Sequence, residues 1–202
     1  FPGWGMPVGW QVDDEDGWFT MSEPNGTATW VPVDDHPSDK ASWTVVVDVP
    51  QGVTAIGNGS LSSGSPSRLG NGWQRWTWRE AQPMASYLVL VAIGRYDLVR
   101  SRHGDVNTVR AFPSSLPKSE RRGFDEIEEI LDWYGTQFGA YPNDDAGAIV
   151  VPTDLGLALE SQTRPLFGLD GVDGGTVSAL PHELAHQWFG DAVTPTTWTD
   201  VW

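Results

Sequence analysis

Residues 181–191, PHELAHQWFGD, contain the pattern His-Glu-x-x-His and decide how the rest of the chain is interpreted. If this stretch is helical, His182 and His186 lie on one face, one turn apart. Two imidazoles in that arrangement can hold one zinc ion, and Glu183 beside them can act on a metal-bound water. The stretch therefore predicts a metal-binding helix. The alternative interpretation is a buried helix with two hydrogen-bonded histidines.

Pro181 directly precedes the first histidine, and a proline has no amide proton to give to a helix interior. Either the helix begins near Leu180 with Pro181 in its first turn, or an earlier turn is kinked at this point. Both arrangements keep the spacing of His182 and His186, because proline disturbs bonding toward the N-terminal side.

A catalytic zinc site usually has three protein ligands, so two histidines leave the set incomplete. His36 and His103 are candidates for the third ligand, and each is also compatible with an ordinary turn or surface residue. Asp191 and Asp200 could orient a ligand imidazole. The alternative for each of these two carboxylates is a helix cap or a solvated side chain.

The composition excludes several classes of partner and site. The 202 residues include 12 basic and 27 acidic side chains, a formal net charge of −15, so the basic footprint of a nucleic-acid-binding protein is absent. The absence of cysteine excludes disulfides, thiolate zinc ligands and a cysteine nucleophile. The longest apolar run, Leu88–Ile93, is too short to be a membrane-spanning segment. The start at Phe1, without a signal peptide, is typical of a processed or truncated chain.

The first half of the sequence predicts a largely antiparallel β domain over residues 1–112. Short β-branched or alternating segments recur about every dozen residues and are separated by turns. The Ser- and Gly-rich stretch 58–71 is interpreted as a hairpin loop. The predicted strands are Ala41–Val49, Val53–Ile56, Trp73–Arg79, Tyr87–Ile93, Leu98–Arg102 and Thr108–Phe112.

The pattern changes near Pro113, where the second predicted domain, residues 113–202, begins. Apolar residues at steps of three and four predict a helix within 118–138, and Gly139 is placed to end it. Residues 146–151 and 154–162 are interpreted as strands, and the metal-binding helix follows. The fold class is therefore α+β, with the β-rich part first.

Several stretches of this sequence resemble the aminopeptidase N family of gluzincin metallopeptidases. The helix and loop at 182–195, with Trp198-Thr199-Asp200-Val201-Trp202, resemble that family's zinc helix and the loop after it. Residues 23–32 and 35–41 resemble its saddle-shaped N-terminal β domain, and residues 82–88 resemble its Pro-Met-x-x-Tyr-Leu strand. The resemblance implies that this β domain is followed by the first part of a thermolysin-like mixed α/β catalytic domain.

The resemblance also implies a third zinc ligand, a Glu on the next helix, at a position just beyond Trp202. On that basis the chain stops before its last metal ligand and lacks the catalytic Tyr and the C-terminal helical domain of the family. The expectation is that the 202-residue chain alone has little or no turnover.

A second family element lies upstream of the zinc helix. Residues 156–162 are similar to the Gly-Ala-Met-Glu-Asn strand of these exopeptidases, with Ala158 and Glu160 at matching positions and Leu157 where the motif has Gly. The resemblance implies that Ala158 and Glu160 bind substrate, and that Glu160 holds its free α-amino group. A carboxylate suits that role, because an ammonium in a partly desolvated cleft needs a charged hydrogen-bonding partner.

The function implied by this resemblance is a zinc-dependent aminopeptidase that removes N-terminal residues from peptides with a free N-terminus. One Zn²⁺ would be held by His182 and His186, and Glu183 would serve as the general base. The alternatives are a gluzincin endopeptidase, which does not need Glu160, and a non-catalytic binding protein with a relic metal helix. An extracellular location is the expectation and a cytoplasmic one the alternative. Residue preference and oligomeric state stay open.

Overall fold

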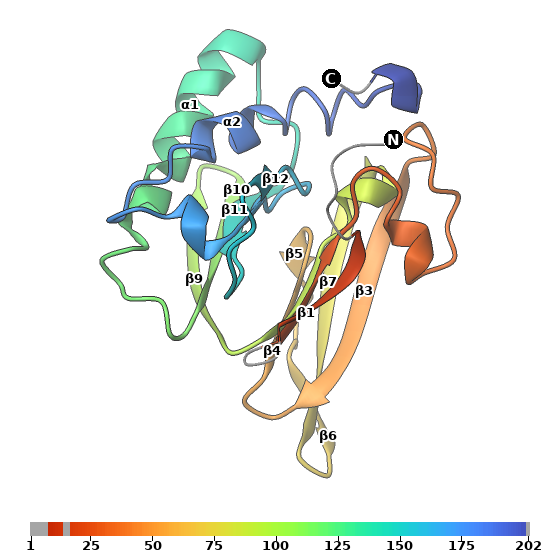
Figure 1. The fold of residues 1–202 in the computed structure, drawn as a ribbon, viewed down its shortest axis with the longest axis vertical. Helices are drawn as coiled ribbons and strands as arrows, with labels where there is room; N and C mark the ends of the chain where they lie inside the picture. Colours follow the sequence, from red (N-terminus) through yellow and green to blue (C-terminus); the bar gives the residue numbers. More distant parts are fainter. Residues whose placement is uncertain (1–7, 14–16, 201–202) are drawn as a thin grey trace.

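The computed structural model describes residues 8–13 and 17–200, which form three β-sheets and two α-helices (Figure 1). The first sheet has the order β1-β2-β8-β4, and all its pairings are antiparallel. Its strands are β1 (Gly9–Asp13), β2 (Gly17–Met21), β4 (Thr54–Gly57) and β8 (Val91–Gly94).

The second sheet is built on the long antiparallel pair β3–β7, and β5 and β6 pair with β7 along its other edge. Its strands are β3 (Ala41–Pro50), β5 (Ser60–Leu61), β6 (Ser67–Gly70) and β7 (Trp73–Met84). Part of the predicted hairpin loop 58–71 is therefore strand, and β6 lies at the lower tip of the molecule in Figure 1. Along β7 the alternation predicted from sequence holds, because Trp76 and Trp78 are buried whereas Trp73 is exposed.

The third sheet is mixed and has the order β12-β13-β11-β10-β9. β10 pairs antiparallel with β9 and parallel with β11, and β11 pairs parallel with β13. Its strands are β9 (Tyr96–His103), β10 (Val106–Pro113), β11 (Asp145–Val150), β12 (Ala158–Leu159) and β13 (Leu166–Phe167). The α+β organisation with β-rich residues first is confirmed. Because this sheet contains strands from both sides of residue 112, no break in pairing falls there, and the domain division stays a prediction.

Two of the predicted strands are wrong in extent. The run 87–93 divides into a 3₁₀ turn, Ser86–Leu88, and strand β8. The physical reason is Asn58, whose side-chain amide donates to the Leu88 carbonyl and accepts from the Leu90 amide, in place of a neighbouring strand. Residues 154–162 contain only the short strand β12, because the amides of Leu155 and Gly156 donate to the Asp170 carboxylate instead of a ladder.

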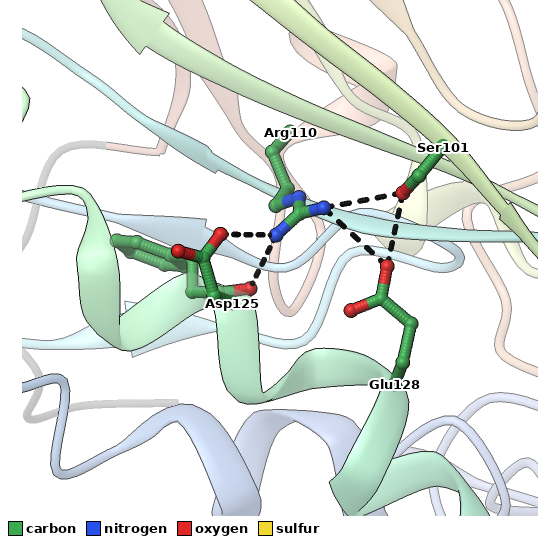
Figure 2. A network of polar contacts seen from close by, with 5 residues as sticks. Ser101, Arg110, Asp125 and Glu128 are labelled. Carbon is green, nitrogen blue, oxygen red and sulfur yellow. Dashed lines mark hydrogen bonds and ion pairs between the residues drawn. The ribbon is translucent and has the colours of Figure 1, made fainter.

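The predicted helix within 118–138 consists of a 3₁₀ segment, Arg122–Glu126, followed by α1 (Ile127–Phe138). A buried arginine on β10 fixes its start, as Figure 2 shows. Arg110 donates from Nη1 to Asp125 at 2.6 Å and from Nη2 to Ser101 at 3.1 Å, and its Nη2 lies 3.4 Å from a Glu128 oxygen. The guanidinium therefore joins the sheet to the beginning of the helix.

Two large cores hold the parts together, and a smaller third core contains Met84, Ala85, Tyr87, Leu88 and Val89. The larger core takes side chains from all three sheets, among them Ile56, Trp78, Leu90, Val109 and Ile149. The second core lies between the third sheet and the helices α1 and α2 (Leu180–Ala185). Its members include Phe112, Phe124, Ile127, Leu131, Phe167, Leu180, Leu184 and Trp188. The helix with the His-Glu-x-x-His pattern is thus packed between α1 and the sheet. In the part of the chain that the structure describes, no helix combines the length and apolarity needed to cross a membrane.

Candidate active site

The His-Glu-x-x-His pattern lies on α2 and the residue after it. The helix begins at Leu180, with Pro181 in its first turn, where the missing amide proton costs nothing. Of the two arrangements open for Pro181, the structure has this one. The helix ends at Ala185, yet His186 keeps helical backbone angles and its amide donates to the His182 carbonyl at 3.3 Å. The one-turn spacing of the two histidines is therefore preserved.

The two imidazoles point to the same place. Their Nε2 atoms lie 3.1 Å apart and their ring centroids 4.7 Å apart. The Nδ1 atom of His186 lies 3.0 Å from the Phe189 carbonyl oxygen, which can only accept a hydrogen bond. In the neutral ring Nδ1 therefore carries the proton and Nε2 has its lone pair free, the form that binds a metal. Two nitrogens on one tetrahedral zinc are about 3.3 Å apart, so this pair fits a zinc ion.

The turn after the helix holds His186 in this orientation. Gly190 has φ +130°, and a Cβ built on it would lie 3.0 Å from His186 Nδ1. The Gly190 carbonyl accepts a hydrogen bond from the Tyr87 hydroxyl at 3.0 Å, and the Gly190 amide donates to the Val193 carbonyl. A glycine is needed here because both the backbone angle and the space beside the imidazole exclude a side chain.

Neither of the other predicted histidines lies with this pair. His36 pairs with Ser38 at 2.8 Å, and His103 pairs with Asp132 at 2.7 Å. Across residues 8–13 and 17–200, no group of three or more His, Cys, Asp or Glu side chains could hold a metal ion. The third ligand expected beyond Trp202 falls outside the described residues.

Glu183 lies on α2 between the two histidines and is buried, with 5% of its surface exposed. Burial raises the pKa of its carboxyl to about 8, and the nearby negative charges of Glu160 and Glu23 add to the effect. A carboxyl in this position holds a proton in the absence of a neighbouring cation. It is therefore able both to take and to give up a proton near neutral pH.

Glu160 follows strand β12, and its main chain contacts the residue after the histidine motif. Its main-chain carbonyl accepts a hydrogen bond from the side chain of Gln187, the residue after His186, at 3.1 Å. Its charge raises the pKa values of Glu183, Glu23 and Asp191. Ala158, the other predicted substrate-binding residue, lies on β12 and lines a cavity of about 440 Å³ with Leu157 and Ala179. Ala179 directly precedes α2.

Glu23 is a site residue that reasoning from the sequence missed. It follows strand β2, and burial together with the charge of Glu160 raises the pKa of its carboxyl to about 7. Its only sequence signal is a carboxylate between a buried strand and Pro24. Nothing in the sequence indicates that it lies near residue 160. The charges of Glu23 and Glu160 therefore act on Glu183, the residue after His182, and negative charges placed in this way favour cationic ligands.

The two aspartates considered as partners of the imidazoles have other surroundings. The carboxylate of Asp200 accepts from the amide and hydroxyl of Thr197. Asp191 is completely buried, neither of its carboxylate oxygens has a hydrogen-bond partner among the described residues, and burial raises its pKa well above the ordinary value. Lys40 donates to the main-chain carbonyl of Asp191 at 2.6 Å. The partner of His186 Nδ1 is accordingly the Phe189 carbonyl and not a carboxylate.

Comparison with known families agrees with this geometry. Residues 13–88 match the model of the peptidase M1 N-terminal domain, and residues 174–202 match the model of the peptidase family M1 domain. The chain is 28% identical over 202 residues to the glutamyl aminopeptidase of Rattus norvegicus, across 91% of this chain and 20% of that protein. It is 27% identical over 194 residues to a probable aminopeptidase 2 of Sulfurisphaera tokodaii, across 91% of this chain and 24% of that protein.

Solved structures agree as well. An M1 zinc metallopeptidase from Deinococcus radiodurans matches with a TM-score of 0.85 and 28% identity, over 97% of this chain and 45% of that one. A mutant of that enzyme bound to a Tyr-Ser-Ala substrate also gives 0.85, over 99% of this chain and 46% of that one. The chain therefore spans a fifth to a quarter of those two curated relatives and under half of the solved chains. It belongs to the peptidase M1 family, the aminopeptidase N family of zinc metallopeptidases, and comprises the family's N-terminal β domain followed by the start of its catalytic domain.

Proposed function

We propose that this protein is a zinc-dependent aminopeptidase that removes the N-terminal residue of peptides. The observation that carries the proposal is the 3.1 Å separation of His182 Nε2 and His186 Nε2, with the buried carboxyl of Glu183 on the same helix. The proposal is also supported by relatives named as aminopeptidases and by a family neighbour bound to a tripeptide.

His182 and His186 would hold the zinc ion, which supplies a polarised scissile carbonyl and a lowered pKa for water when it is bound. Glu183 takes a proton from the attacking water and passes it to the leaving amine. Its pKa of about 8 without a metal falls when a cation lies beside it, so the carboxylate is available as a base near neutral pH.

Glu160 and Glu23 bind the substrate's α-ammonium group. Burial, and after it the charge of Glu160, raises the pKa of Glu23 to about 7, and one bound ammonium relieves the repulsion between the two carboxylates. An amino end held there brings the first peptide bond to the two imidazoles. Removal of one residue at a time follows from that arrangement.

The experiment compares the full-length protein on a free peptide and on the same peptide with an acetylated N-terminus. Because acetylation removes the ammonium charge, kcat/KM is expected to fall by at least about a hundredfold. In Glu160→Gln, cleavage of the free peptide falls and the preference for it over the acetylated peptide shrinks. Equal cleavage of both peptides by the unaltered protein would point to an endopeptidase, and a protein that neither binds zinc nor cleaves either peptide would be a binding protein.

A further inference from the structure

The segment that follows Glu160 contains one residue with an unfavourable backbone conformation, which neighbouring groups have to stabilise. Thr163 has φ +65°, in the left-handed region that a β-branched residue rarely occupies, and only 1% of its surface is exposed. The amide of Arg164 closes the turn by donating to the Ser161 carbonyl at 2.9 Å. Such strain persists only where the surroundings over-determine it, and it is concentrated at functional sites.

One support comes from the residue that follows the second histidine, just beyond the end of α2. Gln187 directly follows His186 and is completely buried. Its Oε1 accepts from the Thr163 amide at 2.7 Å, and its Nε2 donates to the Glu160 carbonyl at 3.1 Å. The oxygen and the nitrogen of this one side-chain amide are therefore both hydrogen-bonded, one to each end of the segment from Glu160 to Thr163.

The other supports come from the loop between β4 and β5 in the first half of the chain. Asn58 donates to the Gln162 carbonyl at 2.7 Å, and the Gly59 amide donates to the Thr163 hydroxyl at 2.8 Å. Arg164 donates to the Gly59 carbonyl at 3.0 Å, and its guanidinium lies 4.7 Å from the centre of the Trp78 ring. The segment is thus fixed against the first half of the chain on one side and against α2 on the other.

We propose that Gln187 is a positioning residue that sets the place of the Glu160 carboxylate relative to the two imidazoles. This inference rests on the proposed aminopeptidase function, in which the amino end at Glu160 and the peptide bond at the histidines belong to one substrate. The Glu160 main chain is attached to the residue after His186, so its side chain starts from a fixed distance to the metal-binding pair. Misplacement by about 1 Å is enough to lower a rate about a hundredfold.

The test replaces Gln187 with Met, which has a similar length and no amide. In the full-length protein, Gln187→Met is expected to lower kcat/KM on free peptides ten- to a hundredfold while zinc content stays unchanged. In a Glu160→Gln background, the same substitution is expected to change kcat/KM less than twofold, because the carboxylate it positions is already gone. The matched control is Gln74→Met. Gln74 lies on β7, its side-chain amide donates to the Val53 carbonyl, and loss of that bond is expected to leave kcat/KM unchanged.

A second measurement does not depend on activity. Hydrogen exchange of the Thr163 amide, followed by mass spectrometry of a peptide covering 160–164, is expected to be at least tenfold faster in Gln187→Met and unchanged in Gln74→Met. Unchanged exchange, loss of zinc, or equal losses of kcat/KM in both backgrounds would overturn the inference. A Glu160→Gln protein that keeps its full preference for free amino ends would also overturn the inference. Equal cleavage of free and acetylated peptides by the unaltered protein overturns the proposed function instead, and this case is distinguished because exchange at Thr163 still accelerates in Gln187→Met.

Discussion

The hydroxyl of Tyr87 donates to the carbonyl of Gly190 at 3.0 Å and joins the first half of the chain to the turn that orients His186. Tyr87 itself belongs to the 3₁₀ turn that precedes β8, and Asn58 fixes the residues after it. The first half of the chain therefore helps to hold the turn beside His186. The same half of the chain contributes Glu23, which follows β2 and whose negative charge acts on Glu183.

Replacing Gly190 with Ala is expected to weaken zinc binding. The residue has φ +130°, and its Cβ would lie 3.0 Å from His186 Nδ1, so the bond from the imidazole to the Phe189 carbonyl is disturbed. Loss of such a partner lowers metal affinity about ten- to a hundredfold. Competition with a chromogenic chelator measures it. Gly135→Ala on α1 is the control, because that Cβ meets open space, and it is expected to stabilise the protein by about 0.5–1 kcal/mol with unchanged zinc affinity.

Glu183→Gln is expected to abolish most of the activity without releasing zinc. The amide cannot take a proton from water, whereas its size suits the buried site and the two imidazoles are untouched. General acid–base catalysis contributes about 10²- to 10⁴-fold, so kcat should fall within that range. Steady-state kinetics and metal analysis of the full-length protein check both parts. Activity close to that of the unaltered protein would remove Glu183 from the mechanism.

Glu80 on β7 makes stability depend on pH. The residue is 3% exposed, and burial raises the pKa of its carboxyl from 4.5 to about 7, against the hydrogen bond from the Gln82 amide. Between these two values the folded state binds the proton and the unfolded state does not, so the free energy of unfolding falls as pH rises. The loss is about 3 kcal/mol, because each pKa unit corresponds to about 1.4 kcal/mol, and it is complete above about pH 7.

Glu80→Gln tests this dependence, because glutamine keeps the acceptor for Gln82 and carries no charge. Urea unfolding at several pH values is expected to show a variant that gains stability over the unaltered protein between pH 4.5 and 7. A difference between the two proteins that does not vary with pH would show that Glu80 stays ionised in the folded state.

Arg110→Met is expected to destabilise the protein by about 2 kcal/mol, the size expected for losing hydrogen bonds to charged groups. The buried guanidinium joins Ser101 on β9 to Asp125 and Glu128 at the start of α1 (Figure 2), and methionine fills the space without replacing these bonds. Thermal unfolding measures the loss. The control is Arg75→Met, which removes an exposed ion pair with Asp48 and should change stability much less. Equal effects of the two substitutions would argue against a structural role for the buried network.

Much of the fold could be predicted from periodicity. The alternation of residues 73–79 predicted a strand, now β7, and the three- and four-residue steps before Gly139 predicted α1. Both patterns are local consequences of strand and helix geometry. The 3₁₀ turn at 86–88 could not be predicted in this way, since it depends on the side chain of Asn58, about thirty residues away.

Part of the candidate site could also be predicted from local sequence patterns, and part of it could not. His182, Glu183 and His186 form a local pattern with a chemical meaning, and the motif similarity around Glu160 supplied the next residue. Glu23 and Gln187 were not found. Their roles depend on contacts between segments that are far apart in the sequence, such as the hydrogen bond from Asn58 to the Gln162 carbonyl, 104 positions away. Contacts of this kind produce no periodic pattern in the sequence from which they could be predicted.

The bonds from Arg164 to the carbonyls of Gly57 and Gly59 bear on how such proteins can be recombined. A chimera with its junction anywhere between residues 59 and 164 would take the two partners of these bonds from different parents. Exchange of the N-terminal domain between relatives is therefore expected to succeed only when the β4–β5 loop and the segment after β12 come from the same parent. These two segments, although about a hundred residues apart in the sequence, are therefore expected to be exchangeable only together.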